Sequence, residues 1–181
     1  MYLENFKKAI ERTEELGLSV PNVEYNGKRY LDSKFLNDLP LLLYRELGAI
    51  DHNDLYKNCM AIHYQLKPIF EKIFNIEIYF TLGNAKVNDT YLFKIEESEI
   101  IDLLENKVKK PINIHAWLTL PSMEILDFSL VTTYCITNKV QEGMGGVITK
   151  HYSELTLGMM YEPMLIGDDF LRKSGGLIET Y

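Results

Sequence analysis

Two neighbouring segments in the middle of the chain alternate apolar and polar residues as the strands of a β-hairpin do. The segments are INIHAWLTL at residues 112–120 and MEILDFSL at residues 123–130, and Pro121 and Ser122 interrupt the alternation. Because side chains alternate between the two faces of a strand, one face of the first segment is wholly apolar and the other is mixed. The pattern therefore predicts two antiparallel strands whose mixed face carries His115 and Asp127.

The register of this hairpin decides whether His115 and Asp127 can meet. Centring the turn on Pro121 places the two residues directly opposite each other, with Cβ atoms about 5 Å apart. A two-residue turn would move them to opposite faces. An interaction between the two side chains therefore requires a loop with an odd number of residues.

A helical run that contains Cys59 precedes the hairpin. The run NDLYKNCMAIHYQLKPIFEKIF, residues 53–74, can begin at Asp51 or Asn53, or restart after Asn58, because all three residues are good N-caps. We favour the restart, which makes Cys59 the first helical residue. Unpaired backbone N–H groups and the helix dipole favour a thiolate at that position. Pro68 predicts a kink or a second segment from Pro68 to Phe74.

The remaining patterns predict an α+β fold with about six strands and four helices, most of the helices preceding the sheet. Helices are expected over 2–16, from a cap at Asp38 to Gly48, and from Ser98 to about Lys107. A hairpin around Asn26-Gly27 is expected over 23–30, and strands over 76–83, 91–95 and 131–137. One or two more strands are expected between 148 and 167, with Pro163 at an edge.

Composition and charge exclude some classes of function. The net charge of -7 argues against a nucleic-acid partner, and the one basic cluster, Lys107–Lys110, follows an acidic run and is typical of a solvated helix. The chain has no apolar run of about 18 residues, so no membrane partner is expected. Its first residues have no apolar signal region, so a cytoplasmic location is expected, although delivery elsewhere as an effector would leave the same pattern.

The cysteine count argues against disulfides and metal sites. Cys59 and Cys135 are too few for a disulfide framework or a CxxC pair, so both are expected to be reduced, with Cys135 in the core. His63 lies four residues after Cys59, but a histidine satisfied within its helix is favoured over a metal ligand. We therefore expect no metal and no cofactor. The length of the chain predicts a single domain over 1–181.

Several of these segments together resemble the transglutaminase-like superfamily, within the papain-like clan of cysteine enzymes. The resemblance rests on Cys59 in a helix, the strand IEIYFTLG, HAWL at 115–118 and LDFS at 126–129. In that group the cysteine opens a helix packed on an antiparallel sheet, and the histidine and the acid lie on neighbouring strands. The resemblance covers residues 53–130, implies an N-terminal helical extension and an insertion that includes 84–90, and lacks the glycine-rich cysteine signature of papain proper.

The resemblance assigns a catalytic role to three residues. Cys59 would attack a carbonyl carbon as the nucleophile, and His115 would carry the proton to the leaving amine. Asp127 would orient the imidazole and stabilise its charge. The expected function is thus hydrolysis of peptide or amide bonds, as in a protease, amidase or deamidase, through a thioester intermediate.

Two further roles follow from the same resemblance. The oxyanion needs two donors, for which the Cys59 backbone N–H and the Asn53 side chain are candidates, while Tyr56 and Asn58 compete with Asn53. Trp117 is either a core residue or part of the substrate cleft.

Two alternative functions remain open. The first is acyl transfer to an amine, as in transglutaminases or arylamine N-acetyltransferases, and the second is an inert binding protein on the same fold. The expected substrate is a peptide, a protein or a small amide, and the sequence predicts no oligomeric state.

Overall fold

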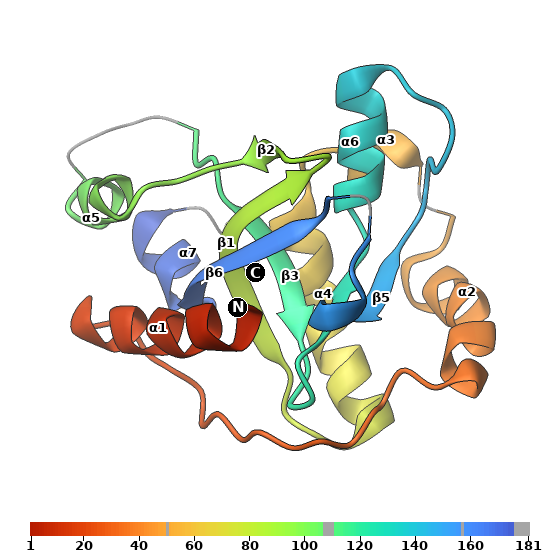
Figure 1. Ribbon diagram of the computed structural model, residues 1–181, viewed down its shortest axis with the longest axis horizontal. Helices are drawn as coiled ribbons and strands as arrows, with labels where there is room; N and C mark the ends of the chain where they lie inside the picture. The colour runs from red at the N-terminus through yellow and green to blue at the C-terminus, as the bar shows by residue number, and fades with distance from the viewer. Residues whose placement is uncertain (50, 107–110, 157, 176–181) are drawn as a thin grey trace. The chain divides into compact units, whose positions relative to one another are not determined.

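The computed structural model describes residues 1–49, 51–106, 111–156 and 158–175, and Figure 1 shows its elements. The basic cluster Lys107–Lys110 lies outside the described residues. The chain forms two compact units. The first unit comprises Met1–Val23, Tyr79–Ala116 and Leu155–Tyr181, and the second comprises Glu24–Ile78 and Trp117–Glu154. The assignment of residues 1–181 to one transglutaminase-like domain stays a prediction.

The first unit is built around strand β1. Its elements are α1 (Tyr2–Glu15), β1 (Tyr79–Val87), β2 (Thr90–Phe93), α5 (Glu97–Leu104), the start of β3 (His115–Thr119), β6 (Met160–Ile166) and α7 (Asp169–Ser174). Strand β1 pairs antiparallel with both β2 and β6, and α1 packs on β6. The ring of Phe6 on α1 lies 5.8 Å from that of Tyr79. The predicted amphipathic helix over 2–16 is therefore confirmed, with its apolar face in the core.

The second unit is built around strand β4. Its elements are α2 (Ser33–Leu47), α3 (His52–Leu55), α4 (Cys59–Phe74), the rest of β3, β4 (Glu124–Asp127), α6 (Leu130–Asn138), β5 (Ile148–His151) and the 3-10 turn η1 (Tyr152–Glu154). Strand β4 pairs antiparallel with β3 and with β5. Aromatic side chains join α4 to its neighbours, since Phe35 of α2 lies 4.8 Å from Phe74 and Phe70 lies 5.5 Å from Phe128, centroid to centroid.

These elements confirm an α+β fold with antiparallel strand pairs. The described residues contain six strands, as predicted, and seven α-helices, of which α5, α6 and α7 follow the first strand. No helix in the described part of the chain is long and apolar enough to cross a membrane.

The hairpin predicted over 23–30 is wrong. Residues 18–32 form no strand, and the Asn26 side chain instead accepts a hydrogen bond from Lys28 N–H at 3.1 Å in an Asx turn. Asn26 N–H donates to the Pro121 carbonyl, and Tyr30 N–H donates to Oε2 of Glu124 at 2.8 Å. Acceptors far along the chain thus bind N–H groups of this segment that a partner strand would otherwise have to satisfy.

Two helix boundaries differ from the prediction. Helix α2 begins at Ser33 instead of near Asp38, because Oδ1 of Asp32 accepts the Phe35 N–H at 2.8 Å and caps it earlier. Pro40 therefore lies inside α2. Helix α4 continues from Cys59 to Phe74 with Pro68 inside it, so of the two alternatives expected at Pro68 the second segment is wrong, and the kink stays a prediction.

The strand predicted over 131–137 is wrong, because these residues belong to helix α6. Their β-branched side chains favour a strand locally. However, Oδ1 of Asp127 accepts the N–H groups of Ser129 and Leu130, at 2.9 and 3.1 Å, and thereby satisfies the start of a helix.

Residues 84–90, which the resemblance assigns to an inserted loop, are mostly strand. Strand β1 continues to Val87, and Asn88 and Asp89 form a tight turn with φ angles of 49° and 58°. The register of β1 and β6 shifts next to Gly83, which faces Pro163. Strand β6 thus accommodates its proline at an irregularity, where a missing N–H is tolerated.

We predict that Glu124→Ala destabilises the protein by about 2–4 kcal/mol, because the buried carboxylate accepts N–H groups from Tyr30 and Leu31 and the hydroxyl of Ser122. Removing it leaves buried donors without an acceptor. Urea denaturation followed by circular dichroism measures the free energy of unfolding. The control is Glu154→Gln, at an exposed carboxylate that pairs with Arg29, as Glu124 does at 3.8 Å, and a change below about 0.5 kcal/mol is expected. Equal effects of the two substitutions would contradict the role of Glu124.

Candidate functional site

Cys59 is the first residue of helix α4, as predicted. The N-cap residue Asn58 makes no side-chain cap, because its amide donates to the Asp54 carbonyl at 2.8 Å. The first helical hydrogen bond runs from Ile62 N–H to the Asn58 carbonyl, so the N–H groups of residues 59–61 have no partner within the helix. Such a helix start favours negative charge, and the Cys59 side chain, 2% exposed, lies at that end.

Asp127 is the last residue of β4 and is buried. Its Oδ1 atom accepts hydrogen bonds from Ser129 N–H at 2.9 Å, the Ser129 hydroxyl at 3.3 Å and Leu130 N–H at 3.1 Å. Because all three bonds fall on one oxygen, they hold the carboxylate in a single orientation while they satisfy the start of α6.

His63 connects the first turn of α4 to the turn that follows β4. Its Nδ1 atom lies 2.7 Å from the Cys59 carbonyl oxygen, and its Nε2 atom lies 3.0 Å from the backbone nitrogen of Phe128. An amide N–H can only donate, so Nε2 is the acceptor, the proton is on Nδ1, and the ring is neutral. Its Nε2 atom also lies 3.5 Å from Oδ1 of Asp127. His63 thus joins the backbone of the predicted nucleophile to the turn of the predicted acid.

These contacts confirm the expectation that the His63 ring is hydrogen-bonded within its own helix, and they add a second partner outside it. The described residues contain no group of three or more His, Cys, Asp or Glu side chains that could hold a metal ion. The sequence favours a histidine satisfied within its helix but does not identify Phe128 as a partner, because nothing in it links a helix histidine to a backbone N–H 65 residues away.

The β3–β4 hairpin has an odd loop, but its centre differs from the prediction. Leu118 pairs with Leu126 instead of Glu124, so the turn is centred on Ser122 and the predicted centring on Pro121 is wrong. Met123 adopts the left-handed conformation, with φ of 65°, and its N–H donates to the Leu120 carbonyl. This loop shifts the register by two residues, so the predicted placement of His115 directly opposite Asp127 is also wrong. An even shift keeps the side chains on their predicted faces.

His115 is the first residue of β3 and belongs to the first unit. Its fully buried ring stacks on Phe93 with a centroid distance of 4.7 Å and lies 6.2 Å from the ring of Tyr161. Cys59 and Asp127 belong to the second unit, where His63 connects them. The convergence of His115 with these two residues stays a prediction.

The Asn53 side chain has a structural partner. Its backbone N–H and its amide both donate to Oδ1 of Asp51 at 2.7 Å, within the cap of α3. The backbone bond first, and the amide bond second, lower the pKa of Asp51. An oxyanion role for Asn53 would require the amide to exchange this carboxylate for the substrate, and it stays a prediction.

Trp117 and Cys135 are core residues. Trp117 has 0% exposed surface, so a role in a substrate cleft, which stays a prediction, would need the surrounding core to open. Cys135 is buried, its thiol lies 3.3 Å from the Glu142 carbonyl, and burial raises the pKa of the Cys135 thiol. The expectation that Cys135 is a core residue is confirmed.

No protein-family model, curated protein or solved structure matches this chain. The resemblance to the transglutaminase-like superfamily therefore stays a prediction from the residues that carry it.

We predict that His63→Leu destabilises the protein by about 2–3 kcal/mol, because it leaves the buried Phe128 N–H without an acceptor. His63→Gln should recover about 1 kcal/mol, since the carbonyl of its amide can replace Nε2. Urea denaturation measures both changes. His52→Leu, at an exposed histidine, is the control and should change the unfolding free energy by less than about 0.5 kcal/mol. If His63→Leu and His63→Gln lowered the free energy of unfolding equally, the hydrogen bond to Phe128 N–H would not be the source of the stabilisation.

Proposed function

We propose that the protein is a cysteine-dependent hydrolase of peptide or amide bonds on a papain-like, transglutaminase-like fold. Cys59 is the nucleophile, His115 transfers the proton, and Asp127 orients the imidazole. One observation carries the proposal: Cys59 opens a helix that has no side-chain cap, and His63 joins this helix start to the turn that holds Asp127.

The reaction proceeds in two steps. The Cys59 sulfur attacks the carbonyl carbon, the C–N bond breaks, and His115 gives the leaving amine its proton. The negative charge that develops on the carbonyl oxygen is stabilised by N–H groups at the start of α4. Water then attacks the thioester, with His115 taking its proton, and the carboxylic acid and the free thiol are released.

Hydrogen bonding favours His115 over His63 as the base. His63 is nearer to Cys59 in the sequence, but its Nδ1 donates to the Cys59 carbonyl and its Nε2 accepts from Phe128. No lone pair of the His63 ring remains for proton transfer. The single orientation of the Asp127 carboxylate is the property that the acid of a triad requires.

We predict that iodoacetamide alkylates Cys59 at pH 7 and that His115→Ala lowers this rate at least about tenfold, because the imidazole no longer stabilises the thiolate. Peptide mapping by mass spectrometry measures the rate at each cysteine. Cys135 is an internal control and should stay unmodified, since burial raises the pKa of its thiol. His151→Ala, at a histidine outside the proposed site, should leave the rate unchanged. A Cys59 rate that is independent of His115 would favour the inert binding protein.

We predict that Asp127→Asn lowers the rate of Cys59 acylation by p-nitrophenyl acetate about 10²-fold while the fold is retained, because asparagine keeps the oxygen that satisfies α6 but loses the charge. Intact-mass spectrometry measures the acyl adduct, which Cys59→Ala should abolish. Asp127→Ala should also destabilise the protein, by about 1–2 kcal/mol, because α6 loses its acceptor. Normal acylation in a folded Asp127→Asn variant would remove Asp127 from the triad.

A further inference from the structure

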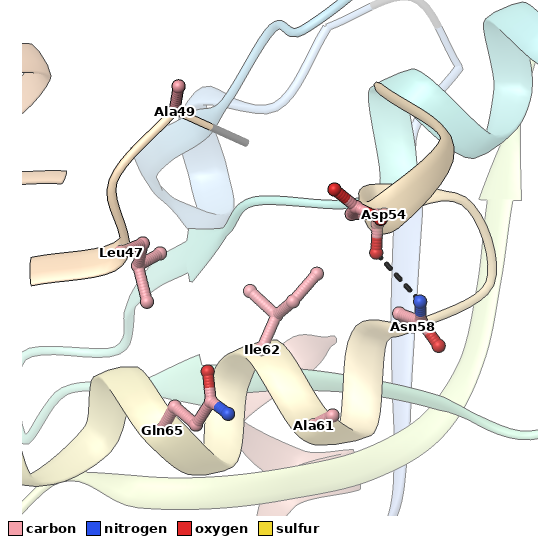
Figure 2. A pocket seen from close by; sticks show the side chains of 7 residues that line it. All are labelled: Leu47, Ala49, Asp54, Asn58, Ala61, Ile62 and Gln65. Carbon is pink, nitrogen blue, oxygen red and sulfur yellow. Dashed lines mark hydrogen bonds between the residues drawn. The ribbon is translucent and has the colours of Figure 1, made fainter. Parts of the chain in front are cut away.

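A cavity of about 300 Å³ opens beside the first two turns of α4, within the second unit (Figure 2). Ala61, Ile62 and Gln65 line it from α4 and Asn58 lines it from the N-cap position, at the spacing that places residues on one flank of a helix. Cys59 begins the same turn. The cavity therefore lies beside the start of α4, although Cys59 itself is not one of its lining residues.

Part of the cavity wall is apolar. Leu47 from the end of α2 and Ala61 and Ile62 from α4 supply hydrocarbon surface, and Figure 2 shows the Ile62 side chain rising from the helix into the cavity. The volume has room for about ten water-sized groups. It can thus hold an amino-acid side chain of several methylene groups together with the adjoining backbone.

The polar groups of the cavity favour a cation. Asp54 contributes a carboxylate and Gln65 a carboxamide, while the described lining contains no lysine or arginine. Oδ2 of Asp54 accepts the Asp51 N–H at 3.2 Å, and the two carboxylate oxygens have further lone pairs for another donor. The chain as a whole carries a net charge of -7, which attracts cationic peptides.

We propose that this cavity binds a lysine side chain of the substrate, at or beside the residue whose carbonyl Cys59 attacks; the inference rests on the proposed function. The four methylene groups of lysine pack against Leu47 and Ile62, and the ammonium group reaches Asp54. The two ends of this arrangement have opposite charge preferences. N–H groups at the helix start donate hydrogen bonds to the carbonyl oxygen, and the Asp54 carboxylate accepts them from the ammonium group. These two contacts orient the substrate.

Binding to the full-length Cys59→Ala variant tests the cavity without requiring any chemistry. The probes are Nα-acetyl-lysine methylamide and its uncharged analogue Nα-acetyl-norleucine methylamide, titrated while backbone amide signals are followed by NMR. We expect the lysine probe to bind about three- to tenfold more tightly at low salt, with shifts at Ala61, Ile62 and Gln65. About 0.5 M salt should reduce the difference, because it screens the charge pair.

Matched variants identify the groups responsible. Asp54→Asn should remove the lysine preference while it keeps norleucine binding, and its amide oxygen can still accept the Asp51 N–H. Asp38→Asn makes the same change of charge on exposed α2 and should leave the preference intact. Ala61→Leu fills the cavity and should weaken both probes.

Each outcome separates this inference from the proposed function. Equal affinities for the two probes, or shifts confined to other regions, would overturn the cavity assignment even if Cys59 is alkylated in a manner that depends on His115. A lysine preference that depends on Asp54, together with an unreactive Cys59, would support the cavity and reject the hydrolase.

Discussion

The second unit depends on the two hydrogen bonds that the neutral imidazole of His63 makes. It is fully buried, and it donates to the Cys59 carbonyl while it accepts the Phe128 N–H. In a low-dielectric interior both bonds are strong, and the loss of either partner would leave a buried polar group unsatisfied. The ring of Phe128 also stacks on Phe70, so the same short turn joins α4 by hydrogen bonding and by apolar packing.

Two buried carboxylates extend this organisation along β4. Glu124 begins the strand and accepts the Tyr30 N–H, and Asp127 ends it and accepts the Leu130 N–H. Each acid therefore satisfies the backbone of a segment that has no strand partner at that point. A strand of only four residues thereby positions both an extended segment and a helix.

The proposed chemistry follows from this division of tasks. His63 is held by two hydrogen bonds, so the proposal assigns proton transfer to His115. It assigns the stabilisation of the developing anion to N–H groups at the start of α4, where Cys59 lies. In the cavity beside the same helix, Asp54 of α3 and the apolar side chains of Leu47 and Ile62 are proposed to bind a cation with a hydrocarbon stem. One helix start can thus serve the reacting carbonyl and the substrate side chain.

Local patterns in the sequence determined the amphipathic helix over 2–16, the start of α4 at Cys59 and the two strands that carry His115 and Asp127. In these segments periodicity and capping agree with the surrounding fold. Tertiary structure alone decided the segments 23–30 and 131–137, whose local preferences favour strands. Glu124, 94 residues from Tyr30, satisfies the backbone of the first, and Asp127 satisfies the helix start of the second. A buried carboxylate outweighs a local propensity of a few tenths of a kcal/mol per residue, because an unsatisfied backbone N–H costs about 1–3 kcal/mol.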